Sequence, residues 1–245
     1  MQDWNAISSA PKEYQQVIWA VQLCQALQTL LWAIHYVEMV RISFKQKTYA
    51  MSLFGLSCNI AWEFVYAVIH PSQDFGDRVT LCIYLTLNLF VVSAAIRFSA
   101  DEWSHAPLVQ RNLPLVFLVS ILFFISAHLA IASAVGPKIG VNWCALLCAQ
   151  ILTIGGLCQL LSRGSSRGAS HFLLLTRNVG TLIGVPPLLL RYRYWPQAFA
   201  YLNNPVLKWH ACIIVLADTL YIIILAHIRR REKREKSPVS RAKDS

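Results

Sequence analysis

Seven apolar runs, each close to the twenty or so residues that cross a hydrocarbon core about 30 Å thick, constrain the fold of this chain most. The connections between them are short and leave no room for a soluble domain. Hydrophobic residues make up 56% of the 245 residues, charged residues make up 14%, and the mean hydropathy is +0.47. The sequence therefore predicts an all-α polytopic membrane protein, one domain over residues 1–245. The predicted spans are Val17–Val40, Tyr49–Ile69, Val79–Ile96, Leu113–Ala134, Val141–Leu161, Phe172–Leu190 and Trp209–His227.

The lysines and arginines alternate between the two sides of the predicted membrane. Fifteen fall in one set of connections and in the C-terminal tail, and six fall in the other set, with Arg177 inside a run. The positive-inside rule then predicts a lumenal N-terminal segment, residues 1–16, and a basic cytosolic tail, residues 229–245. The tail suits contact with anionic membrane lipids, so the net charge of +10 does not indicate a nucleic-acid partner.

Two carboxyl groups lie well inside the predicted spans, away from the span ends. Glu63, in the stretch CNIAWEFVYAVIHP, and Asp218, in CIIVLADTLY, would each cost about 3 kcal/mol or more as anions in hydrocarbon. Counting about 1.5 Å per residue places both about 10 to 13 Å from the lumenal surface. The same count brings three further residues to this depth, so we expect one polar layer around a shared cavity. These three are Asn88, His128 and Gln150.

The absence of a basic partner at this depth suggests a role for the carboxyl groups. By the same count Arg177 and Lys208 lie near span ends, so the lowest-energy state has Glu63, Asp218 or both protonated. A neutral buried carboxylic acid is a general acid held ready. The residues do not decide which of the two donates the proton.

Other residues of the layer have more general interpretations. Trp62 and Tyr66 flank Glu63, and their ring faces could stabilise a cation or simply pack. His128 could relay a proton or be a core histidine. Asn88 and Gln150 are typical of hydrogen bonds between membrane helices.

All seven cysteines lie inside the apolar runs. Cys144 and Cys148 are one helical turn apart, but neither has a histidine or carboxylate nearby in sequence. We therefore expect the cysteines to be small buried residues, and we expect no metal site.

Three segments carry a resemblance to a known family: TYAMSLFGLSCNIAWEFVYAVIHPSQ (48–73), FSADEWSHAPLVQRNLPL (98–115) and GGLCQLLSRGSSRGAS (155–170). Together with the ends of the chain, from Ser9 to Arg230, they resemble the small integral-membrane terpene cyclases of fungal meroterpenoid and indole-diterpene biosynthesis. The resemblance covers nearly the whole chain and its long matches are specific.

The resemblance implies a seven-helix enzyme of the endoplasmic reticulum that protonates the terminal epoxide of a prenylated aromatic and drives polyene cyclisation. It implies that Glu63 and Asp218 are catalytic. It also implies a hydrophobic epoxyprenyl substrate supplied by an upstream prenyltransferase and epoxidase, and neither cofactor nor metal. We expect an isomerase or lyase acting on an epoxyfarnesyl, polyketide-derived aromatic.

Two alternatives stay open at this point. The first is a cyclase acting on an epoxygeranylgeranyl indole. The second is a small proton-coupled seven-span transporter, which would use the same buried carboxyl groups. An inverted repeat between the two halves would favour the transporter, and we see none.

Overall fold

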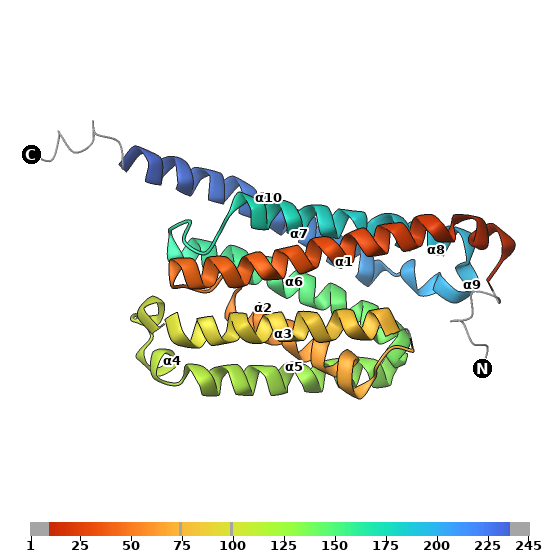
Figure 1. The fold of residues 1–245 in the computed structure, drawn as a ribbon, viewed down its shortest axis with the longest axis horizontal. Helices are drawn as coiled ribbons and strands as arrows, with labels where there is room; N and C mark the ends of the chain where they lie inside the picture. Colours follow the sequence, from red (N-terminus) through yellow and green to blue (C-terminus); the bar gives the residue numbers. More distant parts are fainter. Residues whose placement is uncertain (1–9, 74, 99, 236–245) are drawn as a thin grey trace, which may run out of the picture.

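Long antiparallel helices form an elongated bundle (Figure 1). The computed structural model describes residues 10–73, 75–98 and 100–235, and all regular secondary structure in these ranges is helical, so the all-α prediction is confirmed. The helices are α1 (Lys12–Gln46), α2 (Leu53–Phe64), the π-helix η2 (Val65–Ile69), α3 (Phe75–Phe98), the 3-10 helix η3 (Ala100–Trp103), α4 (Pro107–Arg111), α5 (Leu113–Val135), α6 (Pro137–Arg163), α7 (His171–Ile183), α8 (Val185–Tyr194), α9 (Pro196–Phe199), the 3-10 helix η4 (Ala200–Leu202) and α10 (Pro205–Glu235).

The predicted spans correspond to these helices. Six of them, with α7 and α8 taken as one continuous segment, are long and apolar enough to cross a membrane. The remaining predicted span, Tyr49–Ile69, corresponds to the shorter apolar helix Leu53–Ile69, made of α2 and η2. Side chains such as Leu118, Leu122 and Phe123 are exposed along α5, as expected of a surface in contact with lipid.

The predicted terminal segments are helical from Lys12 onward at one end and up to Glu235 at the other. Helix α1 begins at Lys12, within the predicted segment 1–16, and α10 continues to Glu235, within the predicted tail 229–245. The remainder of both segments, residues 1–9 and 236–245, lies outside the described residues.

Local sequence explains where the helices begin and end. The Ser52 hydroxyl accepts a hydrogen bond from the Gly55 amide and caps α2, and Ser170 caps α7 by accepting from Leu173. Helix α6 starts after Gly136, with φ at +83°, and stops at Gly164, with φ at +58°, two positive-φ conformations that glycine adopts without strain.

The end of the bundle where α1 stops and α2 starts carries most of the positive charge, and we call it the basic end. There Glu102 accepts hydrogen bonds from Arg163 at 2.6 Å and from the Thr48 hydroxyl. Arg163 also donates to the carbonyl oxygen of Tyr49. These bonds tie the connections after α1, α3 and α6 to one another.

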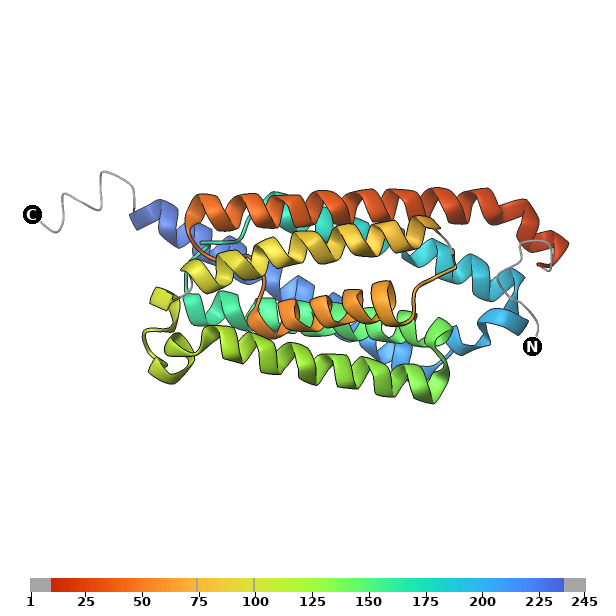
Figure 2. The same ribbon diagram turned by 60° about the horizontal axis from the view of Figure 1, so that its bottom comes forward.

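Helix α2 is the buried centre of the fold. It packs against α3, α5 and α6, and Figures 1 and 2 show it inside the bundle between α3 and α5. Nearly every residue from Leu53 to Glu63 is buried. A Cβ on Gly55 would lie 3.1 Å from the Cα of Leu152, so this glycine permits the close approach of α2 and α6. The polar side chains of α2 therefore face other helices.

Candidate active site

Glu63 is fully buried and held by three hydrogen bonds. The Tyr36 hydroxyl of α1 donates to Oε1 at 3.0 Å. The Asn88 amide of α3 donates to Oε1 at 2.8 Å and to Oε2 at 2.9 Å. Asn59, one helical turn before Glu63, donates to the Tyr36 oxygen at 2.9 Å. This four-residue group, the Glu63 cluster, fixes the carboxyl group between three helices.

No cation pairs with the Glu63 carboxyl group in the part of the chain that the structure describes. Its bonding groups are a neutral amide and a neutral phenol. An isolated carboxylate in such a dry site is expensive, whereas the protonated acid is tolerated. The surroundings of Glu63 therefore suit a group that holds a proton.

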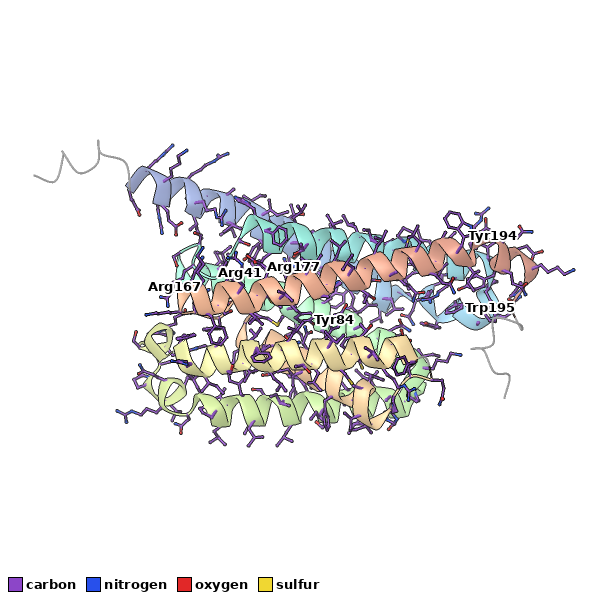
Figure 3. The ribbon with its side chains drawn as sticks, viewed as in Figure 1. Arg41, Tyr84, Arg167, Arg177, Tyr194 and Trp195 are labelled. Atoms are coloured by element: carbon purple, nitrogen blue, oxygen red, sulfur yellow. The ribbon has the colours of Figure 1, made fainter. Side chains whose placement is uncertain are left out.

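Asp218 has a different environment, and here one expectation from the sequence was wrong. Arg177 of α7 forms an ion pair and a hydrogen bond with Asp218 of α10. Their side chains are only 9% and 14% exposed, and the Arg177 guanidinium also lies 5.3 Å from the ring centre of Tyr221. Figure 3 shows Arg177 farther from the basic end than Arg41 and Arg167. A basic residue does reach the level of Asp218, because the long arginine side chain extends away from its own backbone position.

The predicted single polar layer is also wrong, since only Glu63 and Asn88 of its five side chains are hydrogen-bonded to one another. Asn88 does meet Glu63, as its predicted depth suggested. Asp218 pairs with Arg177 instead. His128 lies on α5 with its Nε2 atom 3.2 Å from the carbonyl oxygen of Cys58. Gln150 is buried on α6. Equal depth along separate helices did not bring these side chains together because it does not fix the direction in which each one points.

Trp62 and Tyr66 face a different helix from Glu63. The Trp62 indole donates to the Val141 carbonyl oxygen at 3.1 Å, and the Tyr66 hydroxyl lies 3.5 Å from Cys144 Sγ, both on α6. Residues three apart on a helix are rotated by about 60° from one another, enough to send Tyr66 toward α6 while Glu63 faces α1 and α3. Their expected place beside the carboxyl group is therefore not what the structure has.

Other aromatic rings lie next to the Glu63 cluster. The Tyr84 ring of α3 lies 4.9 Å from the Tyr36 ring, and the Trp32 ring of α1 lies 6.0 Å from it. Their sequence positions did not predict this, since Trp32 and Tyr36 lie on α1 and Glu63 lies on the following helix, α2. A one-turn spacing of Trp32 and Tyr36 on α1 is the only signal that a sequence search could have used.

A small cavity lies beside Arg177, the partner of Asp218. Its volume is about 40 Å³, and Arg177, His35 and Tyr221 lie on its wall. His35 is 3.2 Å from the Thr176 hydroxyl, and its neighbour Tyr36 bonds Glu63. Binding sites for small molecules usually occupy about 300–1,000 Å³, so the helices must move apart before a large substrate can enter.

Comparison with known proteins shows which family the chain belongs to. The profile of the Pyr4-like transmembrane terpene cyclases matches residues 5–231. The chain belongs to this family. It is 44% identical over 234 residues to terpene cyclase pyr4 of Aspergillus fumigatus, covering 96% of this chain and 97% of that one. It is 45% identical to terpene cyclase janB of Penicillium janthinellum over 227 residues, covering 93% of each chain.

The family membership establishes the general activity. This chain is a fungal-type membrane terpene cyclase, an enzyme that closes rings in secondary metabolism. The predicted family is confirmed, and the transporter alternative has no support from these relatives. A third relative, terpene cyclase atmB of Aspergillus flavus, is 44% identical over 227 residues.

Proposed function

We propose that this cyclase protonates the terminal epoxide of an epoxyfarnesyl, polyketide-derived aromatic and that Glu63 is the proton donor. The observation that carries the proposal is the Glu63 cluster: a fully buried carboxyl group bonded only by neutral donors among the described residues. Asp218, paired with Arg177, is a poorer donor because its proton would be displaced by the guanidinium charge.

The reaction is an isomerisation in which protons and electron pairs balance. The Glu63 carboxyl group transfers its proton to the epoxide oxygen, the carbon–oxygen bond breaks, and the nearest alkene supplies the electrons for a new carbon–carbon bond. Further alkenes repeat this step. The last cation loses a proton to a base, and Glu63 takes up a proton again before the next turnover. No metal ion or cofactor takes part in these steps.

The Glu63 cluster also stabilises what remains after proton transfer. Tyr36 and Asn88 aim donors at the two carboxyl oxygens, where negative charge develops as the proton leaves. The rings of Tyr36, Tyr84 and Trp32 are candidates to stabilise the cations, in place of Trp62 and Tyr66. We place the oxygen-rich aromatic head beside the Arg177 end of the small cavity, where a guanidinium can donate to it.

We further infer seven membrane spans: the six long apolar helices, and α2 with η2 as one additional span, the second along the chain. A helix from Leu53 to Ile69 covers about 25 Å, short for a lipid-exposed span but adequate for one buried among other helices. Helix α1 begins at one end of the bundle and α10 finishes at the other, as an odd number of crossings requires (Figure 1). The positive-inside rule then places the basic end in the cytosol, with the N-terminus in the lumen of the endoplasmic reticulum.

The substrate class can be tested in microsomes that contain the expressed protein. An epoxyfarnesyl aromatic polyketide and an epoxygeranylgeranyl indole are supplied separately, and chromatography with NMR distinguishes each ring-closed product from its isomeric substrate. We expect the first substrate to close at least about tenfold faster. Ring closure of the indole alone would show that the substrate class is an epoxygeranylgeranyl indole and would contradict the proposed farnesyl substrate. Closure of neither would overturn the epoxide-initiated reaction.

Tyr36→Phe tests the role of the Glu63 cluster. Loss of one donor to the developing carboxylate should lower kcat by roughly 100-fold while KM stays nearly unchanged. Tyr84→Phe is the matched control, because the Tyr84 hydroxyl donates to the Thr29 carbonyl oxygen and not to Glu63. Equal activity of the two variants would contradict an electrostatic role for Tyr36.

A further inference from the structure

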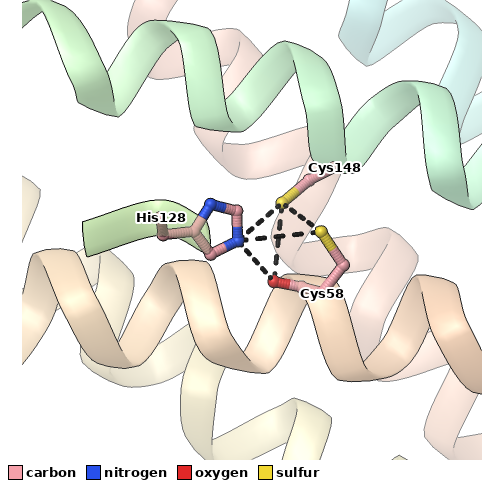
Figure 4. A group of neighbouring side chains, drawn as sticks. All are labelled: Cys58, His128 and Cys148. Carbon is pink, nitrogen blue, oxygen red and sulfur yellow. Dashed lines mark hydrogen bonds between the residues drawn. The ribbon is translucent and has the colours of Figure 1, made fainter. Parts of the chain in front are cut away.

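Three side chains of types that can ligate a metal ion, from three helices, meet in the buried core (Figure 4). Cys58 lies on α2, His128 on α5 and Cys148 on α6, and all three are buried. The two Sγ atoms are 3.4 Å apart, and His128 Nε2 lies 3.7 Å from Cys58 Sγ and 3.9 Å from Cys148 Sγ. The sequence did not reveal this group because His128 is 70 residues from Cys58 and 20 residues from Cys148 along the chain.

These separations match the edges of a coordination tetrahedron. Zinc binds thiolate sulfur at about 2.3 Å and imidazole nitrogen at about 2.0–2.1 Å, which places two sulfurs about 3.8 Å apart and a sulfur and a nitrogen about 3.6 Å apart. The carbonyl oxygen of Cys58 borders the same space, 3.2 Å from His128 Nε2 and 3.5 Å from Cys148 Sγ. An ion could enter with shifts of only a few tenths of an ångström.

Hydrogen bonding alone explains this group poorly. A thiol is a weak donor and a weak acceptor, so Cys58 and Cys148 gain little by facing one another. His128 Nδ1 has no hydrogen-bond partner among the residues that the structure describes. Apart from the contact of His128 with the Cys58 carbonyl oxygen, the hydrogen bonds within this group therefore all involve a thiol and are weak.

The charges also suit a divalent ion in a dry core. The negative charges of two thiolates would balance the charge of a Zn²⁺ ion, and a neutral imidazole would add none. The occupied group would therefore have no net charge, and no large desolvation cost would oppose its burial. The two thiol protons would pass to solvent as the ion binds. Phe124 lies beside His128 and partly buried Ile125 and Ile151 pack against the same region, which keeps water away.

We propose that Cys58, His128 and Cys148 bind one structural Zn²⁺ ion. The ion would link α2 to α5 and α6, and α2 also carries Glu63 five residues further along the chain. The ion takes no part in ring closure, so a test of zinc binding does not depend on the proposed epoxide chemistry.

The test is the zinc content of the purified full-length protein in detergent, measured by inductively coupled plasma mass spectrometry. We expect about one zinc per chain in the intact protein. Cys148→Ser and His128→Gln should each reduce it to about a tenth or less, since three ligands fall to two. Cys158→Ser, which changes an exposed thiol on the same helix, is the matched control and should keep its zinc.

Thermal unfolding provides a second measurement, in which each protein is compared with itself before and after the chelator is added. A membrane-permeant chelator should lower the unfolding temperature of the intact protein and of Cys158→Ser, and leave that of His128→Gln unchanged. Zinc well below one per chain in the intact protein would overturn the proposal. Equal zinc content in all variants, or a Cys58–Cys148 disulfide instead of a bound ion, would also overturn it.

Discussion

Arg177→Leu is expected to destabilise the protein by about 3–5 kcal/mol, because it leaves Asp218 buried without its cation. Asp218→Leu should cost a similar amount by leaving the guanidinium unpaired. The double variant should recover most of the loss, since a pair of well-packed apolar side chains replaces a buried ion pair at little cost. The free energy of unfolding, measured by denaturing-detergent titration, gives all three values.

The Arg41–Glu38 pair, in which only the arginine is exposed, provides the control. The Arg41 side chain is 57% exposed, so Arg41→Leu should change the free energy of unfolding by less than about 1 kcal/mol. Losses of that small size in the Arg177 and Asp218 single variants would contradict a stabilising ion pair.

Activity of the same double variant separates two roles for Asp218. If Asp218 only holds α7 against α10, the stable double variant should close rings at close to the normal rate. If the carboxyl group or the guanidinium contacts the substrate, the double variant should be stable and inactive. We expect the second outcome, because Arg177 lies on the wall of the small cavity.

Glu63→Gln is expected to lower kcat by at least about 1,000-fold, since an amide cannot donate the proton that opens the epoxide. The fold should be retained. Glutamine has nearly the same shape, and its oxygen can still accept from Tyr36 or Asn88. Glu63→Gln should therefore greatly lower turnover in microsomes and leave the unfolding temperature in detergent nearly unchanged.

A second variant tests whether the loss of activity in Glu63→Gln could come from an indirect effect on folding. Glu38→Gln alters another buried glutamate of similar size, which pairs with Arg41 outside the Glu63 cluster. It should leave kcat within about threefold of the intact protein. If both variants lose activity equally, the loss in Glu63→Gln reflects helix packing instead of proton transfer.

The spans could be predicted from sequence because apolar length is the property that a membrane selects. Leu113–Ala134 was placed within one residue of α5, Leu113–Val135. Helix α1 extends beyond its predicted span at both ends, since helix formation continues into polar sequence after the apolar residues stop. The π-helix Val65–Ile69 had no signal, because its wider turn depends on packing.

The candidate site could be predicted in part. Glu63 stood out because an acid is rare in an apolar run, and Asn88 was placed at its depth correctly. Tyr36 and Asn59 were missed, since a tyrosine and an asparagine in a membrane helix are common and neutral. Arg177 was missed because counting residues from a span end locates a backbone atom and not the end of a long side chain.

The most direct test of the account is a single-turnover experiment on Glu63→Gln. The variant and the intact protein, each in excess over the preferred epoxide substrate, are stopped at intervals and extracted, and the bound material is identified by NMR. We predict that the intact protein releases the ring-closed isomer and that the variant binds the substrate but returns it as the unopened epoxide. Ring-closed product from the variant at the intact rate would contradict Glu63 as the proton donor.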